Sequence, residues 1–229
     1  MEHQVDRAHK PTGLGVKLSK IRRRVFDTAS PVDSIFRYVR HRATGKPIPQ
    51  GFQWTRAVMY EALMKELRRL GSNTMAALEI SPGDFWQTQD FKSYKGVTYP
   101  EFDICSQTLP DQFDLIIADQ VFEHLLWPYR AARNVYAMLK PGGWFINTTP
   151  FLIRIHENPF DCTRWSETGM RYLLAEGGFD LQQIRTASWG NRSCVKANLR
   201  HTGWAVLSRW RSLRNDPVYP LVVWAIAQK

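Results

Sequence analysis

The run FDLIIA at residues 113–118 constrains the fold of this chain more than any other segment. Its apolar character is nearly continuous, as a parallel strand that is covered on both faces requires. Helical spacing follows over residues 128–139, and Pro-Gly-Gly at 141–143 predicts its end before another apolar strand at 144–149. This succession of strand, helix and strand is typical of an α/β fold with a parallel sheet.

Further elements extend the pattern on both sides. Apolar residues recur every three to four positions over residues 54–70, which predicts a helix that ends at Gly71. We also expect a helix at 166–176. The remaining expected strands lie at 76–80, at 93–98 with a brief continuation at 102–104, and at 182–186, 192–198 and 221–227. The late strands lack an intervening long apolar helix, so we expect a final antiparallel hairpin. The whole predicts a doubly wound, mostly parallel seven-stranded sheet, which binds ligands at its carboxyl edge.

The length of 229 residues suits one core domain with extensions. We place a partly helical N-terminal extension at residues 1–50, and an α/β domain with a basic C-terminal hairpin region at 51–229. The net charge of +10 is uneven, because residues 1–46 and 182–229 each carry +7 and leave the middle at −4. Such ends attract an anionic surface or substrate, or they only add solubility.

Three cysteines without a CxxC pair indicate a reducing compartment, so the expected location is the cytoplasm. No apolar run approaches the ~20 residues of a spanning helix, and the N-terminus lacks an apolar signal core. Residues 204–214 mix tryptophan with arginine, which fits either a surface helix packed on the core or a peripheral membrane contact. No recognised binding motif supports nucleic acid as a partner. The oligomeric state is not readable from the sequence.

Polar residues follow three of the expected strands. The segment EISPGD at residues 79–84 ends one strand in a sharp turn, whose N–H groups we expect to be free to meet a ligand. The segment FDIC at 102–105 places Asp103 just before Leu-Pro. The segment DQVFEHL at 119–125 follows the strand FDLIIA directly. All three segments would lie at the carboxyl edge of the sheet.

With FDL before it and LKPGG after it, DQVFEHL resembles the class I S-adenosylmethionine-dependent methyltransferases that carry a type 11-like domain. The resemblance spans roughly residues 54–190. It implies a Rossmann-like fold, S-adenosylmethionine as cofactor and methyl transfer as the reaction. The cofactor-binding residues that it implies are Glu79, Ser81, Pro82, Gly83, Asp103, Asp119 and Gln120.

The chain departs from the family pattern in its glycine-rich loop. Ser81 and Phe85 stand where the family usually has its first and third glycines, and Phe85 would enlarge the start of the helix expected there. Thr98, with Glu101 as a displaced substitute, stands where an acidic residue usually holds the ribose. Asp103 could instead cap a turn. An alternative function is therefore a methyltransferase-like protein that has lost cofactor binding and acts as a partner or scaffold.

The segment HENPFDCTRW, which begins at His156, combines a potential base with a potential anion clamp. We predict that His156 is a catalytic base oriented by Asp161, and that Arg164 binds the substrate. Alternatively, Asp161 and Arg164 form an internal salt bridge that caps a helix near Ser166. We predict no metal site, since the segment has one histidine and no CxxC, and we interpret His124 as a packing residue. Similar segments in bacterial methyltransferases imply a small-molecule or glycan-type acceptor, which the basic ends suggest is anionic.

Overall fold

The computed structural model describes residues 53–200, 204–208 and 211–229. The expected extension at residues 1–50 lies outside these residues, as does its boundary with the α/β domain. No helix among the described residues is long and apolar enough to cross a membrane.

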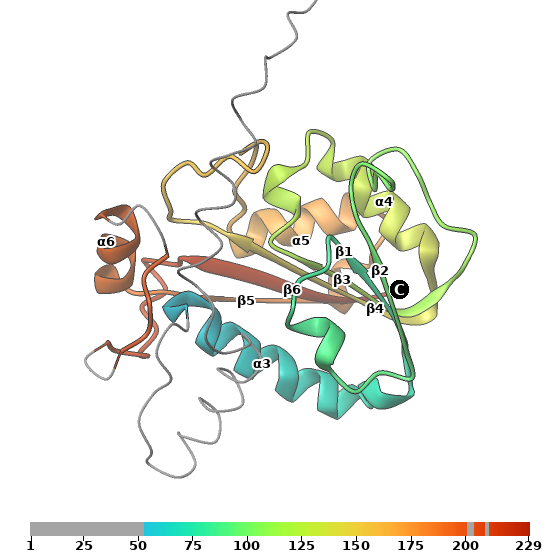
Figure 1. Ribbon diagram of the computed structural model, residues 1–229, viewed down its shortest axis with the longest axis horizontal. Helices are drawn as coiled ribbons and strands as arrows, with labels where there is room; N and C mark the ends of the chain where they lie inside the picture. The colour runs from blue at the N-terminus through green and yellow to red at the C-terminus, as the bar shows by residue number, and fades with distance from the viewer. Residues whose placement is uncertain (1–52, 201–203, 209–210) are drawn as a thin grey trace, which may run out of the picture. The chain divides into compact units, whose positions relative to one another are not determined.

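A six-stranded sheet forms the centre of the described domain (Figure 1). Its strands are β1 (Ala76–Ile80), β2 (Ser93–Val97), β3 (Phe113–Asp119), β4 (Leu139–Pro150), β5 (Ile184–Trp189) and β6 (Val222–Gln228). They are arranged in the order β2-β1-β3-β4-β6-β5. The first four in this order pair in parallel, whereas β6 runs antiparallel to both β4 and β5. The expected mostly parallel sheet is therefore confirmed.

Helices cover both faces of the sheet, as a doubly wound fold requires (Figure 1). They are α3 (Trp54–Leu70), α4 (Pro128–Met138), α5 (Glu167–Glu176) and α6 (Arg192–Arg200). Side chains alternate along β3, so Leu115 and Ile117 pack with α3 while Ile116 packs with α4 and α5 on the other face. The buried run FDLIIA is thus explained by two cores that share one strand.

Several expectations for single elements are wrong. Among the described residues the sheet has six strands rather than seven, and residues 102–104 form a turn. Residues 192–198 lie in the helix α6, although the expected antiparallel pairing of the last strands is present between β5 and β6. The side chains of Cys194 and Asn198 are both buried one helical turn apart, and Asn198 Oδ1 accepts from the Ala205 amide at 3.0 Å. Residues 204–208 are irregular instead of helical.

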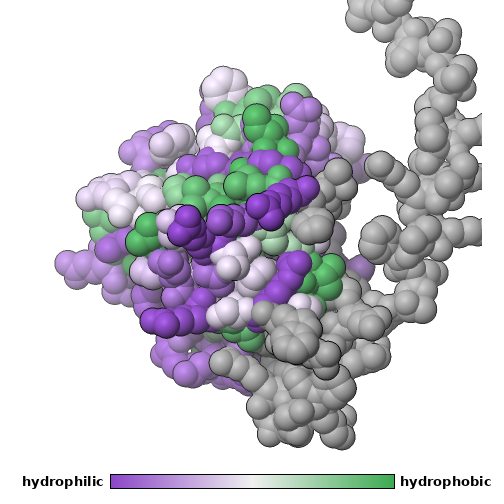
Figure 2. All heavy atoms as spheres, turned by 90° about the vertical axis from the view of Figure 1, so that its left-hand side faces the viewer, coloured by the Kyte–Doolittle hydropathy of each residue, from purple (hydrophilic) through white to green (hydrophobic). Residues whose placement is uncertain are grey.

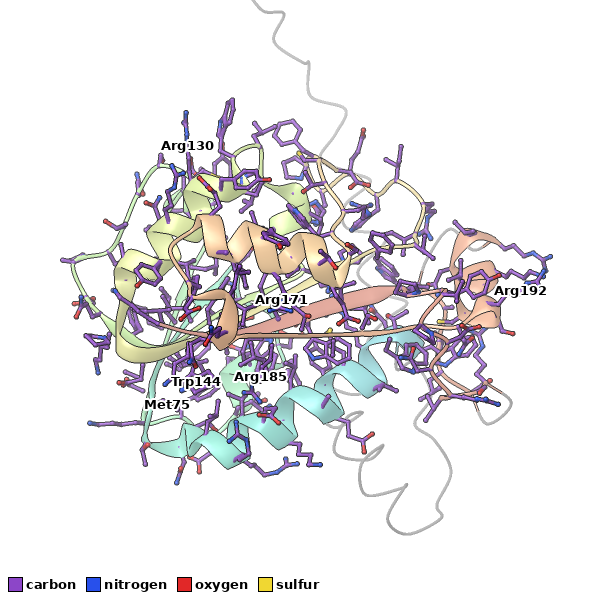
Figure 3. The ribbon with its side chains drawn as sticks, turned by 180° about the vertical axis from the view of Figure 1, so that it is seen from behind. Met75, Arg130, Trp144, Arg171, Arg185 and Arg192 are labelled. Carbon is purple, nitrogen blue, oxygen red and sulfur yellow. The ribbon has the colours of Figure 1, made fainter. Side chains whose placement is uncertain are left out.

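The Pro-Gly-Gly segment lies inside β4 rather than before it. Leu139 pairs with Phe113 and Trp144 pairs with Leu115, so the intervening residues bulge from the strand. Gly143 permits this bulge, because a Cβ there would lie 2.9 Å from the Lys140 carbonyl oxygen. Farther along the back of the sheet, the Arg185 guanidinium lies 5.7 Å from the centre of the Trp144 ring (Figure 3).

The connection from β1 to β2 holds only the short 3-10 turn η2 (Trp86–Thr88), and the connection from β2 to β3 holds no helix. The helix expected after EISPGD is therefore absent. Phe85 stacks on Tyr60 of α3 at a centroid distance of 4.1 Å, and Trp86 meets the same ring edge-on at 5.6 Å. Both side chains are buried. These contacts hold the segment after β1 against α3.

Candidate active site

The loop after β1 is held mainly by bonds within the protein. The Ser81 N–H donates to the Val97 carbonyl at 2.7 Å, and the Gly83 N–H donates to Glu79 Oε1 at 3.0 Å. The expectation that these N–H groups are free for a ligand is therefore wrong. Ser81 has a φ of 59°, in the left-handed region that glycine adopts at lower cost. The turn after β1 is thus held by hydrogen bonds to β1 and β2 themselves.

Glu79 supports this loop from below. Its side chain is buried, and Oε2 accepts a second bond from the Tyr94 hydroxyl at 2.5 Å. Burial raises the pKa of Glu79 to about 7, although both hydrogen bonds favour the charged form. Glu79 consequently positions the loop, and its predicted contact with the cofactor stays a prediction.

Asp119 at the end of β3 is the centre of a hydrogen-bond network. Its Oδ2 accepts from the Tyr60 hydroxyl and from Trp86 Nε1, the latter at 3.0 Å. Its Oδ1 accepts from Thr148 Oγ1 at 2.6 Å. These donors come from α3, η2 and β4, so Asp119 ties three elements to the sheet. The network gives this predicted cofactor residue a structural role.

The next residue, Gln120, also turns the chain, with a φ of 60°. Its side-chain amide donates to Thr148 Oγ1 at 2.9 Å. Gln120 and Ser81 therefore bring the ends of β3 and β1 to one cleft, which has a volume of about 290 Å³. The far wall of this cleft includes His124, Trp127 and Phe160. The carboxyl edge thus forms a pocket where the sequence predicts one.

A second hollow, of about 620 Å³, lies at the end of β2. Its lining includes Thr98 and Glu101, the two residues considered for the ribose position. Phe102 borders both hollows, so the two adjoin. Asp103 lies in the wall of the smaller cleft, yet its Oδ1 accepts from the Cys105 N–H at 2.9 Å. The turn-capping alternative for Asp103 is therefore confirmed, and its contact with the cofactor stays a prediction.

The structure joins the loop after β3 to the loop after β4. The Glu123 carbonyl accepts from the N–H groups of Cys162 and Thr163 at 2.8 and 3.3 Å. His124 Nδ1 lies 2.5 Å from the Phe160 carbonyl oxygen. As a result the rings of His124 and His156 meet edge-to-face with their centroids 5.0 Å apart. Two sequence segments that were interpreted separately form one cluster.

Within that cluster the expected pair of His156 and Asp161 is not formed through the ring. His156 Nδ1 lies 3.6 Å from Asp161 Oδ2, which is beyond hydrogen-bond range. The His156 backbone N–H donates to that oxygen at 2.8 Å instead. Arg164 binds both oxygens of Asp161, which lowers the pKa of Asp161 to about 2. The salt-bridge alternative is therefore confirmed. Ser166 itself caps α5 by accepting from the Gly169 N–H.

His124, and not His156, lines the cleft. The pKa of His156 is lowered by burial and by the neighbouring His124. The interpretation of His124 as a packing residue overlooked this position, because only the contact with Phe160 turns the ring toward the cleft. The roles predicted for His156 as a base and for Arg164 as a substrate clamp remain predictions.

Glu123 is the residue that the sequence interpretation missed most completely. Its side chain is fully buried, and neither carboxylate oxygen meets a hydrogen-bond donor in the described part of the chain. Burial raises the pKa of Glu123 to about 8, and the charge of Asp119 adds to the shift. Its neighbour along the chain is His124, whose Nε2 lies 3.6 Å from Glu123 Oε1. No periodicity in the sequence distinguishes this glutamate from a surface residue.

Residues 59–147, which span α3 to β4, match the profile of a family described as a methyltransferase domain. This match, together with the motifs after β1 and β3, makes residues 59–147 similar to the class I S-adenosylmethionine-dependent methyltransferases. The match supports methyl transfer as the reaction and S-adenosylmethionine as the cofactor. A search of curated proteins finds no match.

Solved structures also resemble the methyltransferase domain at low sequence identity. A possible exported protein from Bordetella parapertussis is 12% identical, with 84% of this chain and 78% of that chain covered and a TM-score of 0.50. An S-adenosylmethionine-dependent methyltransferase from Archaeoglobus fulgidus is 15% identical, with 74% and 94% covered and a TM-score of 0.49. A third, from Mesorhizobium loti, is 14% identical, with 73% and 98% covered and a TM-score of 0.47. At these identities, the comparison with the Bordetella protein shows the fold alone.

Proposed function

We propose that this methyltransferase acts on a small-molecule or glycan-type acceptor with an anionic group. The observation that carries the proposal is the cleft of about 290 Å³, which gathers Ser81 and Gln120 on one side and an aromatic wall on the other. Clefts of this kind, mostly apolar with a few convergent polar groups, are typical of small-molecule sites.

The cofactor would extend across both hollows. Ser81 and Gln120 would hold its amino-acid half at the ends of β1 and β3, and Gly83 would keep the loop open, since a Cβ there meets no atom within 4 Å. Glu101 at the larger hollow would accept hydrogen bonds from the ribose hydroxyls. The room in the adjoining hollows supports this placement. The engaged N–H groups of the loop predict weaker binding than a glycine-rich loop would provide.

The acceptor would bind at the aromatic wall. Four large side chains that line the cleft are more than half exposed: Tyr99 70%, Leu126 58%, Trp127 55% and Phe160 51%. Figure 2 shows the molecule from the side of α6 and of the loop after β4, where apolar residues gather among hydrophilic ones. Flat aromatic faces suit the apolar face of a sugar or another ring.

A cation at the rim supports the anionic group. The Arg130 guanidinium of α4 lies 4.7 Å from the centre of the Trp127 ring, and Figure 3 shows this arginine on the outer side of the helix. A guanidinium presents paired donors that match a carboxylate or phosphate. Arg130, which was not among the predicted site residues, is therefore a better-placed substrate clamp than Arg164, whose donors are engaged by Asp161.

Methyl transfer needs little chemical assistance from the protein. The sulfonium already activates the methyl group, so alignment of donor and acceptor supplies much of the barrier reduction. An acceptor hydroxyl that must lose its proton would meet His124 first, since His124 borders the cleft.

Calorimetric titration of the full chain with S-adenosylhomocysteine tests cofactor binding. We expect saturable binding, with an affinity that falls at least tenfold in Gln120→Ala. The affinity should be unchanged in Gln87→Ala, whose side chain is exposed outside the cleft. Absence of heat at high micromolar ligand would instead support the scaffold alternative. For the acceptor, transfer of labelled methyl to anionic sugars should fall in Arg130→Gln through a higher KM. Transfer only to neutral acceptors would contradict the proposed class.

A further inference from the structure

The cluster beneath the acceptor side of the cleft has the composition of a metal site. Glu123 and His124 follow β3, and His156 follows β4. Each residue offers one ligand atom, and these atoms all lie within 4.8 Å of one another. Ligands of a tetrahedral zinc ion lie roughly 3.3 Å apart, so small rotations of the three side chains would bring them to coordinating distance.

The buried carboxylate is an independent sign that a cation belongs here. Glu123 is fully buried, and no other described residue donates a hydrogen bond to either of its oxygens. A buried carboxylate is expensive unless it is paired with a positive charge or with hydrogen-bond donors. The arginines that act on it electrostatically are engaged elsewhere, since Arg164 binds Asp161 and Arg56 donates to the Tyr60 hydroxyl.

The histidines are held in orientations that suit ligands. The Phe160 carbonyl oxygen can only accept a hydrogen bond, so His124 Nδ1 must carry the hydrogen that it donates. Nε2 is then the acceptor nitrogen of the ring, and it lies on the side of Glu123. A carbonyl that fixes the tautomer in this way is the usual partner of a metal-binding histidine. His156 packs edge-on against Trp204 at 5.4 Å, and its Nδ1 is buried without a hydrogen bond in the described chain.

We propose that Glu123, His124 and His156 bind one divalent transition-metal ion at the acceptor side of the cleft. Two imidazoles and one carboxylate are a donor set for Zn²⁺ or Fe²⁺ with an open coordination position, whereas Mg²⁺ and Ca²⁺ prefer oxygen ligands alone. Because His124 lines the cleft, the open position would face the acceptor. This part of the inference rests on the proposed function.

A metal in that position would activate an acceptor hydroxyl. Metal binding lowers the pKa of a coordinated water from 15.7 to about 7, and it acts on a coordinated hydroxyl in the same direction. The hydroxyl proton would pass to solvent water, because His124, bound to the metal through Nε2, could no longer act as the base. The oxygen then forms a bond to the methyl carbon as the S–CH₃ bond breaks, which leaves S-adenosylhomocysteine as a neutral thioether.

The test uses the full chain after chelator treatment and dialysis. Calorimetric titration with Zn²⁺ and absorption titration with Co²⁺ should each reveal one site, and the Co²⁺ complex should show visible bands of nitrogen and oxygen ligation. Glu123→Gln and His156→Gln should each weaken this site at least 100-fold. Histidines elsewhere in the chain contribute a background that is common to all variants and cancels.

Two matched controls should leave metal binding unchanged. Glu157→Gln changes an exposed acid next to His156, and Cys162→Ser removes an exposed thiol whose Sγ lies 3.7 Å from the His124 carbonyl oxygen. Circular dichroism confirms that each variant folds, and the Co²⁺ spectrum of the unaltered chain tests the ligands without mutation.

Binding that survives both ligand variants, or no metal binding by the unaltered chain, would overturn the inference. Titration of the same metal-free protein with S-adenosylhomocysteine separates the two proposals. Cofactor binding without metal binding removes only the metal site, and metal binding without cofactor binding removes only the proposed function.

Discussion

Asp119 and Glu123 lie four residues apart after the same strand, but their surroundings are opposite. Three donors from α3, η2 and β4 bind Asp119. Glu123 is more deeply buried, and no described donor reaches it. The contrast teaches that the carboxyl edge of β3 has two faces with separate tasks. The face toward α3 holds the fold together, whereas the face toward the loop after β4 holds a buried carboxyl group that no other described residue binds.

The largest effect is expected from Asp119→Ala. The substitution leaves the Tyr60 hydroxyl, Trp86 Nε1 and Thr148 Oγ1 without their shared acceptor. Buried donors without acceptors cost about 1–3 kcal/mol each, so we expect the free energy of unfolding to fall by about 3 kcal/mol. Urea denaturation measures it. A loss below about 1 kcal/mol would show that the network does not stabilise this face.

The next largest effect is the pH dependence of stability that Glu79 causes. Its pKa is raised although its carboxylate accepts two hydrogen bonds. Its pKa is about 7 in the folded chain and 4.5 as the ordinary value, so the native state holds an extra proton between these pH values. Stability is therefore full below about pH 4.5 and falls as pH rises through 7. Glu79→Gln should reduce the fall between pH 5 and pH 8 by about 2–3 kcal/mol, because a pKa unit corresponds to about 1.4 kcal/mol and roughly two units of the shift lie within this range.

Urea denaturation at pH 5 and pH 8 checks the prediction for Glu79. The exposed Glu157→Gln is the control, and its stability should follow the pH dependence of the unaltered chain. An unchanged slope in Glu79→Gln would place the titrating group elsewhere.

At pH 5, where the raised pKa keeps Glu123 protonated in the folded chain, Glu123→Gln should change the stability of metal-free protein by less than about 1 kcal/mol, because no hydrogen bond from another described residue is lost. Thermal unfolding in chelator compares this variant with Asp119→Ala directly. A loss as large as that of Asp119→Ala would break the contrast between the two carboxylates and assign Glu123 a structural role.

The smallest effect is expected from Ser81→Gly. Glycine adopts the observed φ of 59° at lower cost than serine, but it also gains freedom in the unfolded chain. We therefore expect a stability gain of about 0.5 kcal/mol and undiminished binding of S-adenosylhomocysteine, measured by denaturation and calorimetry. Weaker binding would show that the Ser81 hydroxyl itself contacts the cofactor.

Local sequence patterns were enough to predict an element where its buried positions recur at regular spacing. The bounds expected for α3 and β1 agree with the structure, because their apolar spacing reports which side faces the core. The same approach failed for residues 192–198, where polar Asn198 is buried and the helix has few apolar residues to mark its period. It also failed after β1, since nothing local shows that Phe85 and Trp86 pack on α3 rather than start a helix.

The sequence by itself determined the parallel sheet, the family and the edge at which the site lies, because strand burial and strand ends are local properties. Only the tertiary structure decided which polar groups meet there. Asp119 and Glu123 look equivalent in the sequence, and their difference arises from partners that are distant along the chain: Tyr60, Thr148 and His156. Contacts between loops of different strands depend on how the strands pair, and residue spacing does not encode them.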